Sequence, residues 1–179
     1  MANLLTASIA NTTRPVKGLK PKAWIFNKMD NHALTFTGNK IINLVKGSGK
    51  TSYKIEGFKD FMNAGSSAVI AENFPTGYKH TFSVDTFSAT AAERANIDLA
   101  DDVFVVVEVN GSQTEGCFLA YGVNNGLWKS AQTQMANDNN AVTKVTFESR
   151  AGMEEVYSVY PLWLTSYAIT LALLVATES

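Results

Sequence analysis

Apolar and polar residues alternate along residues 77–87, the clearest periodic stretch of the sequence. Tyr78, His80, Phe82 and Val84 fall on one side, and polar residues fall between them. Alternation with a period of two is typical of a strand that buries one face. The pattern therefore predicts a half-buried strand in this stretch.

A short helix and a second strand are predicted directly afterwards. Thr90 is a candidate N-cap, and Glu93, three residues later, completes a capping box before an alanine-rich run. Residues 103–109 are nearly all apolar and mostly β-branched, as expected of a strand covered on both faces. Residues 76–109 are thus expected to form a strand–helix–strand unit at the centre of the core.

Further strand patterns recur along the chain, separated by turn residues. Asn110-Gly111 is the strongest hairpin signal, and residues 46–50 have the composition of a loop. Many short strands with one helix predict a mainly β protein, an antiparallel sandwich or barrel with one flanking α-helix. The remaining expected strands are 22–27, 33–37, 39–45, 51–58, 117–123 and 142–148, with 68–72 ambiguous.

The two ends of the chain differ from this pattern. Residues 1–22 are polar and irregular, and we expect an extended N-terminal arm that packs on the domain or on a neighbouring subunit. Residues 23–179 are expected to form one β-rich domain. Residues 157–177 are very apolar, but Pro161 and several hydroxyl residues interrupt a stretch that would need about 20 apolar residues to span a membrane. We therefore expect these residues to form a buried strand pair or to dock on a neighbouring subunit. We do not expect them to span a membrane.

Charge is scarce and unevenly distributed. Only 17% of the 179 residues are charged, which favours an oligomer whose surface is partly covered, and the net charge of -1 gives no case for nucleic-acid binding. Residues 1–60 hold ten basic and three acidic side chains (+7), and the rest hold five and thirteen (-8). In the folded domain the two halves either intermix, so that their charges average out, or form two faces of opposite charge that favour head-to-tail association.

The sequence carries no enzyme signature. Residues 47–51, Gly-Ser-Gly-Lys-Thr, resemble the end of a phosphate-binding loop, but Leu44 stands where the first glycine is required. His80, Ser83 and Asp85 lie on one predicted strand, whose alternating faces prevent a catalytic triad. We therefore expect no catalysis and no cofactor.

Two further groups have ordinary structural interpretations. Cys117 is the single cysteine and is expected to be a small core residue rather than a nucleophile. Asp98, Asp101 and Asp102 have the residue type of a cation site, but they are expected to form a solvated acidic loop after the helix. No metal site is predicted.

In its general pattern the chain resembles the tail tube proteins of long-tailed bacteriophages and related injection machines. The resemblance rests on the 76–109 unit, the Asn110-Gly111 hairpin, the basic loop 46–52 and the uneven charge. It implies a β-sandwich subunit of stacked hexameric rings that form a DNA conduit in the virion, after assembly in the host cytoplasm. The implied partners are other copies of the chain, other virion proteins and passing DNA, which is not bound sequence-specifically.

Candidate residues follow from that function. The arm and the basic loop predict inter-subunit contacts through Arg14, Lys46 and Lys50, with Asp101 and Asp102 as acidic partners. Duplex DNA is densely negative, so a conducting lumen should be neutral or acidic. One face of a sheet running from Val103 to Glu148 is the predicted lining, and Glu108, Glu115 and Glu148 are its candidates, although outward, solvated positions are equally compatible with the pattern.

Other functions fit the same pattern. Head–tail connector, tail terminator and capsid-decoration proteins share much of this fold. A β-rich domain that recognises a carbohydrate or host surface through Trp24, Trp128 and Trp163 is an alternative from another class. Exposed tryptophans would support that alternative, and buried ones would indicate plain core packing.

Overall fold

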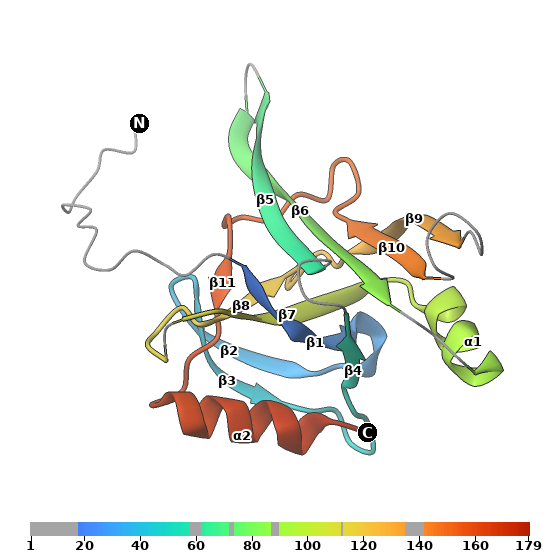
Figure 1. Cartoon of the computed structure of the whole chain (residues 1–179). Helices are drawn as coiled ribbons and strands as arrows, with labels where there is room; N and C mark the ends of the chain where they lie inside the picture. The colour runs from blue at the N-terminus through green and yellow to red at the C-terminus, as the bar shows by residue number, and fades with distance from the viewer. Residues whose placement is uncertain (1–17, 58–61, 72–73, 87–89, 112, 135–141) are drawn as a thin grey trace.

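The protein is built in three layers, with a five-stranded sheet between a four-stranded sheet and a layer formed by a hairpin and a helix (Figure 1). The computed structural model describes residues 18–57, 62–71, 74–86, 90–111, 113–134 and 142–179. Residues 1–17 of the predicted arm lie outside the described residues. The predicted mainly β sandwich with a flanking helix is confirmed.

The middle sheet has the order β11-β8-β7-β1-β4, and every neighbouring pair is antiparallel. β1 begins at Leu19, three residues before the predicted start, so the last residues of the predicted arm already belong to this sheet. Its strands are β1 (Leu19–Asn27), β4 (Tyr53–Glu56), β7 (Val103–Val109), β8 (Phe118–Tyr121) and β11 (Tyr160–Pro161).

The second sheet has the order β5-β6-β10-β9 and is also antiparallel. β5 and β6 form a long hairpin that projects beyond the rest of the sandwich (Figure 1). Its strands are β5 (Met62–Ala71), β6 (Phe74–Thr86), β9 (Trp128–Gln134) and β10 (Thr143–Glu148). β9 was not among the predicted strands.

The third layer contains the hairpin of β2 (Ala33–Thr37) and β3 (Lys40–Val45) together with helix α2 (Tyr167–Thr177). A short 3-10 helix, η1 (Lys28–Asp30), joins β1 to this hairpin. The predicted strand pair in the apolar tail is wrong, because most of that segment is α2. No helix in the described part of the chain is long and apolar enough to cross a membrane.

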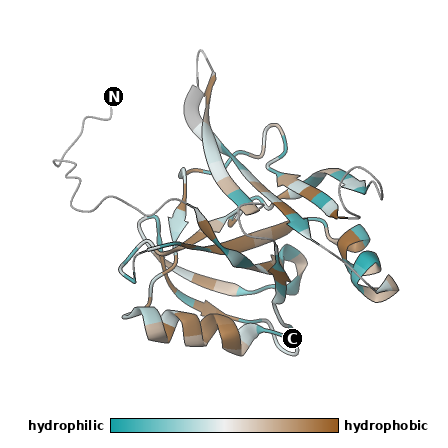
Figure 2. Cartoon of the chain, in the orientation of Figure 1, coloured by the Kyte–Doolittle hydropathy of each residue, from teal (hydrophilic) through white to brown (hydrophobic). Residues whose placement is uncertain are grey.

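β7 lies at the centre of the core and is covered on both faces, as predicted. Val103, Val105 and Val107 belong to a cluster shared with the four-stranded sheet. Phe104 and Val106 belong to a second cluster, which packs against α2 and β3. Figure 2 shows the hydrophobic strands of the middle sheet between the two outer layers.

The predicted unit 76–109 is confirmed as β6, helix α1 (Ala91–Leu99) and β7, but its two strands lie in different sheets. The capping box is present, since Thr90 Oγ1 accepts from Glu93 N at 3.2 Å and Thr90 N donates to Glu93 Oε2 at 2.9 Å. α1 has no buried residue. The C-terminal end of α1 is fixed by Lys129, whose Nζ donates to the carbonyls of Ile97 at 3.1 Å and Asp98 at 2.6 Å.

Candidate functional site

His80 is the only histidine with full burial, and both of its ring nitrogens are bonded to backbone. Nδ1 accepts from Gly122 N at 3.0 Å, so Nε2 carries the proton and donates to Tyr157 O at 2.8 Å. Burial lowers the pKa of His80, which keeps the ring neutral. A histidine whose nitrogens are both committed in this way joins segments and has no capacity for acid–base catalysis.

Next to His80, the buried carboxylate of Glu155 binds the turn that follows β8. It accepts from the backbone N–H groups of Asn124 at 3.0 Å and Asn125 at 2.9 Å, and from the Tyr160 hydroxyl at 3.0 Å. Burial and this carboxylate raise the pKa of Tyr160. Sequence reasoning missed Glu155, because it stands in an irregular polar segment. With His80 it fixes three chain segments to one another, and its oxygens are occupied by donors.

The other residues considered for chemistry have structural roles. Cys117 is 2% exposed, and burial raises the pKa of its thiol, so it is a core residue as predicted. Asp101 Oδ1 accepts from Lys129 N at 3.0 Å, and Asp98 bonds the side chain of Gln132. No group of three or more histidine, cysteine or acidic residues in the described ranges is arranged to hold a metal ion.

The basic loop is held by its own subunit. Lys50 Nζ lies 3.0 Å from Asp30 Oδ1, and Lys46 Nζ donates to Ala176 O at 3.3 Å. The loop is further fixed by Gly47 N, which donates to His32 Nδ1 at 3.3 Å. Both lysines keep substantial exposure, but neither contacts Asp101 or Asp102 within the chain. Whether they meet across subunits stays a prediction, and Arg14 lies outside the described residues.

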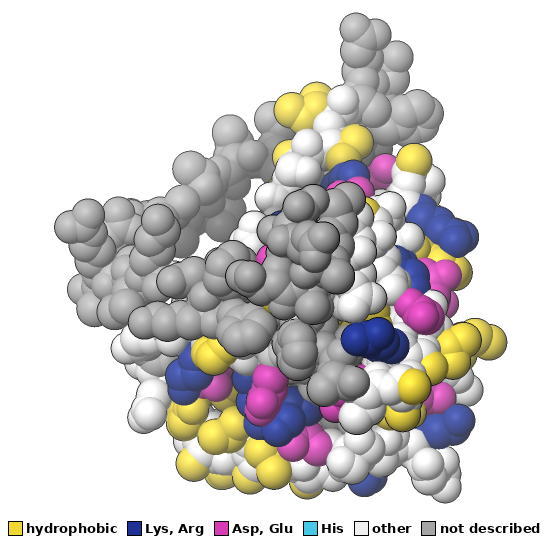
Figure 3. Space-filling view, turned by 45° about the vertical axis from the view of Figure 1, so that its right-hand side comes forward, with side chains coloured by type: hydrophobic (Ala, Val, Ile, Leu, Met, Phe, Trp, Pro, Cys, Tyr) yellow, Lys and Arg dark blue, Asp and Glu magenta, His cyan; other side chains and the backbone are white. Residues whose placement is uncertain are grey.

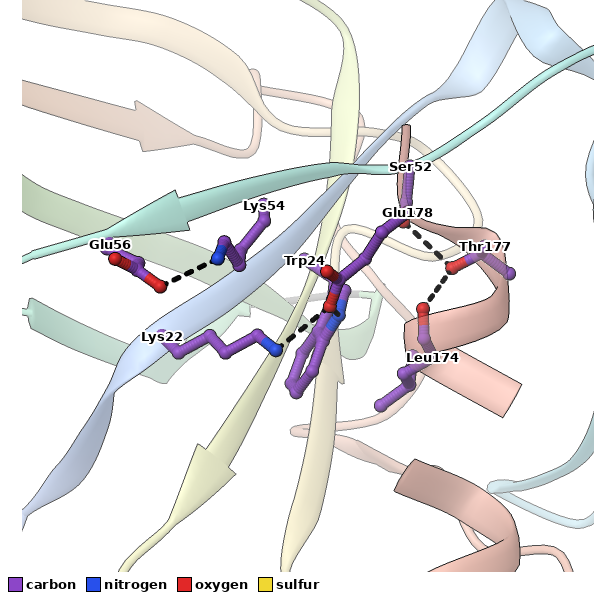
Figure 4. A network of polar contacts seen from close by, with 8 residues as sticks. All are labelled: Lys22, Trp24, Ser52, Lys54, Glu56, Leu174, Thr177 and Glu178. Atoms are coloured by element: carbon purple, nitrogen blue, oxygen red, sulfur yellow. Dashed lines mark hydrogen bonds and ion pairs between the residues drawn. The ribbon is translucent and has the colours of Figure 1, made fainter. Parts of the chain in front are cut away.

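A network at the C-terminus fastens α2 to the middle sheet (Figure 4). Glu178 Oε1 accepts from the indole N–H of the fully buried Trp24 at 2.8 Å and lies 2.9 Å from Lys22 Nζ. These two hydrogen bonds lower the pKa of the Glu178 carboxyl, and the bond from Lys22 has the larger effect. Thr177 Oγ1 donates to Leu174 O at 2.6 Å, so the Ser52 hydroxyl donates to Thr177 Oγ1 at 2.8 Å. The apolar tail is therefore an integral part of the sandwich.

The three lumen candidates do not share a face. Glu108 is buried on β7, 2.5 Å from Lys20 Nζ, and accepts from the Tyr167 hydroxyl at 2.7 Å. Glu115 follows β7 and pairs with Lys40 at 3.3 Å, whereas Glu148 ends β10 in the other sheet. The prediction of one sheet from Val103 to Glu148 is wrong, because β7 and β8 belong to the middle sheet and β9 and β10 to the four-stranded sheet.

Of the three tryptophans, one is buried and two are half-buried. Trp24 is fully buried, and neither Trp128 nor Trp163 is among the exposed large hydrophobic residues of the described ranges. The Arg150 guanidinium covers the Trp128 ring at 3.3 Å from its centroid. Trp163 packs partly against the cluster beneath α2. Only Trp24 therefore meets the expectation of core packing in full, and the sugar-binding alternative stays a prediction.

The surface best suited to recognition is the pair of free edges of the four-stranded sheet. Within the described chain, β5 and β9 each pair with a single strand. Ser66–Ile70 of β5 and Ser130–Gln134 of β9 are exposed, and both stretches lack charge and proline. Ile70 is 83% exposed. A long edge without such blocking residues is a template for pairing with another chain.

The edges of the middle sheet are blocked by comparison. β11 ends in Pro161, which cannot donate to a ladder. β4 carries Lys54 and Glu56, and Ser179 N donates to the carbonyl of Ser52, the residue before this strand, at 3.2 Å. Among the described residues, the four-stranded sheet is therefore the sheet whose two edges lack such blocking.

The outer face of the four-stranded sheet is polar, and its lysines are paired with acids. Lys79 pairs with Glu148 at 2.6 Å, and Lys144 pairs with Asp85 at 3.5 Å, in both cases between β6 and β10. The other outward residues of β6 are Thr81 and Ser83. Both lysines that β6 and β10 place on this face are therefore paired with an acid.

No protein-family model, no curated protein and no solved structure matches this chain. The functional argument therefore rests on the geometry of the molecule.

Proposed function

We propose that the protein is a virion structural protein that assembles head to tail into rings, most specifically the tube protein of a bacteriophage tail. The open edges of the four-stranded sheet carry this proposal. β5 of one copy pairs with β9 of the next, and repetition of this heterologous contact closes a ring when the rotation allows it. Ring formation satisfies the exposed backbone groups of both edges.

The paired charges of the outer face support the conduit function. When the sheets of successive subunits join, their faces become one continuous wall. Lysine-rich walls would hold the phosphate backbone of duplex DNA, which carries about one charge per 1.7 Å of its axis. A face on which Lys79 and Lys144 are neutralised by Glu148 and Asp85 suits the passage of DNA without retention.

Substitution of an exposed edge residue tests the assembly. Ile70→Glu places a charge on the open β5 edge without disturbing either core cluster, because Ile70 is 83% exposed. We expect the variant to remain a folded monomer where the wild-type protein forms rings or tubes. Sedimentation velocity and negative-stain microscopy measure the change.

Met29→Glu is the matched control, since Met29 is 84% exposed on η1, away from the four-stranded sheet. It should assemble as the wild type does. A wild-type protein that stays monomeric at high concentration contradicts the proposed function. Rings that persist in Ile70→Glu contradict the assignment of the β5 edge. Rings that cap a tail or a head, rather than stack, would indicate a terminator or connector.

A further inference from the structure

The C-terminal end of α1 is bound to β9, an edge strand of the four-stranded sheet (Figure 1). Asp101 Oδ1 accepts from the backbone N–H of Lys129 at 3.0 Å, and Asp98 bonds the side chain of Gln132. In the other direction, Lys129 Nζ donates to the carbonyls of Ile97 and Asp98. Residues 97–101, which we call the cover, are therefore fastened to β9 between Lys129 and Gln132.

One of these bonds occupies a backbone group of the edge itself. In the described chain β9 pairs with β10 alone, and the N–H of Lys129 is bound by a carboxylate. An incoming strand needs the backbone donors of an edge strand to build its ladder of hydrogen bonds. While the Asp101 carboxylate holds this donor, pairing at the start of β9 is blocked.

The cover has few attachments to the core. α1 contains no buried residue, and Leu99 at its end is 81% exposed. Ile97 and Ala100 pack against the core but are only partly buried. A hollow of about 730 Å³ lies between α1 and strands β1, β4 and β10. Because a helix of nine residues is marginal by itself, the position of α1 depends strongly on its polar bonds to β9.

The chain is firmly anchored directly after the cover. Asp102 O accepts from Lys28 N at 3.0 Å, and the next residue, Val103, is fully buried. Asp102 itself has the left-handed backbone conformation, with φ at 50°, which turns the chain between the cover and β7. Movement of residues 97–101 can therefore leave β7 in place.

We propose that the cover is an autoinhibitory contact that regulates the β9 edge during assembly. The inference rests on the proposed function, in which β5 of another copy pairs with this edge. An incoming strand offers a backbone carbonyl to the Lys129 N–H and displaces Asp101 from it, so the donor remains bonded throughout. The free subunit thus exposes less of the edge than the assembled subunit uses, which limits pairing with wrong partners.

The association rate of the full-length chain tests the cover. Asp101→Ala removes the acceptor of the Lys129 N–H, and we expect light scattering to show association about fivefold faster than in the wild type. Asp101→Asn keeps an oxygen acceptor and should give an intermediate rate. Glu115→Ala is the control, because it removes an acid beyond the opposite end of β7, and should associate as the wild type does.

Amide exchange of the dilute monomer gives a second reading that needs no assembly. In Asp101→Ala we expect faster exchange at Lys129 and in Ala91–Leu99, because the cover opens more often. The melting temperature should change little, since α1 has no buried residue. Equal exchange in Asp101→Ala and wild type overturns the cover, whatever the association rates are.

The association results separate this inference from the proposed function. Wild-type assembly with an equal or slower rate in Asp101→Ala overturns the cover and leaves the proposed function intact. Equal acceleration in Glu115→Ala also overturns it, because the effect is then not specific to β9. No association of any variant overturns both. Association of Asp101→Ala alone supports the cover and contradicts unaided assembly of the wild type.

Discussion

At the scale of single residues, His80 links the stability of the protein to pH. Burial lowers its pKa in the folded chain, whereas an unfolded histidine titrates near about 6.5. Below about pH 6.5 the unfolded chain therefore binds more protons than the folded chain, and the free energy of unfolding falls as the pH drops. We expect urea unfolding midpoints to decrease between about pH 7.5 and 5.5, and to level off below the folded pKa.

Replacement of the ring isolates this effect. His80→Gln should be less stable than the wild type near neutral pH but should show a shallower decrease in the same interval. Burial also lowers the pKa of His32, so His32→Gln measures the contribution of that residue to the pH dependence of stability. Asp30 and Glu178 lose their stabilisation only in stronger acid, because their unfolded pKa values are 3.8 and 4.5. Equal slopes in His80→Gln and wild type would contradict the assignment to His80.

Glu178 gives a second prediction at this scale. Glu178→Ala removes the acceptor of the buried Trp24 indole N–H, and an unsatisfied buried donor costs about 1–3 kcal/mol of unfolding free energy. Glu178→Gln keeps an acceptor and should cost less. Equilibrium denaturation measures both. Glu56→Gln, at the exposed pair with Lys54, is the control and should leave stability almost unchanged, because solvent screens such a pair. A similar loss in all three variants would contradict the network.

Sequence patterns predict some of these residues and miss others. The alternation around His80 correctly predicts a half-buried strand, and the usual burial of a lone free cysteine correctly predicts Cys117 in the core. Glu155 and Glu108 are buried as well, but an isolated acid carries no periodic signal. Their burial depends on donors that are distant in sequence, such as Asn124 N for Glu155 and Lys20 for Glu108.

At the scale of helices and strands, the sequence predicts those elements whose residues follow a distinct pattern. β6, α1 and β7 were predicted because alternation, a capping box and a β-branched run each have a distinct pattern. β9 was missed because its exposed residues, from Ser130 onward, are almost all polar and do not alternate. The pattern does not predict α2, because a segment that is almost all apolar and without charge has no polar face to reveal its period.

The capping box of α1 should control that helix locally. Thr90→Ala removes the side-chain acceptor of Glu93 N, a change that typically costs about 1 kcal/mol. Since α1 has no buried residue, we expect faster amide exchange in Ala91–Leu99 with little change in global unfolding. Hydrogen-exchange mass spectrometry and thermal denaturation separate the two effects.

Ser166→Ala is the matched change at the N-cap of α2, where Ser166 Oγ accepts from Ile169 N at 3.3 Å. α2 packs on the core through Leu174 and Thr170, so the loss of its cap should lower the global melting temperature. If Thr90→Ala lowers global stability as much as Ser166→Ala does, α1 is more strongly coupled to the core than its exposure indicates.

At the scale of the whole molecule, the uneven charge of the sequence is averaged by folding. Lysines of the first sixty residues pair with acids of the remainder at Lys20–Glu108, Lys22–Glu178 and Lys40–Glu115. Basic and acidic side chains are interspersed over the face shown in Figure 3. The proposed self-association therefore gains no support from charged halves and depends on the backbone edges, whose pairing would be less sensitive to salt.

The outer face of the four-stranded sheet gives the prediction that belongs to the assembled tube. Asp85→Asn with Glu148→Gln leaves Lys79 and Lys144 without their partners and makes this face basic. We expect tubes of this double variant to retain duplex DNA at low salt and to release it as salt rises, because released counterions drive such binding. Co-sedimentation of tubes with DNA measures retention. Glu115→Gln, which frees Lys40 away from this sheet, is the control. Wild-type tubes that retain DNA as strongly as the double variant would contradict a passive conduit and favour a connector that grips DNA.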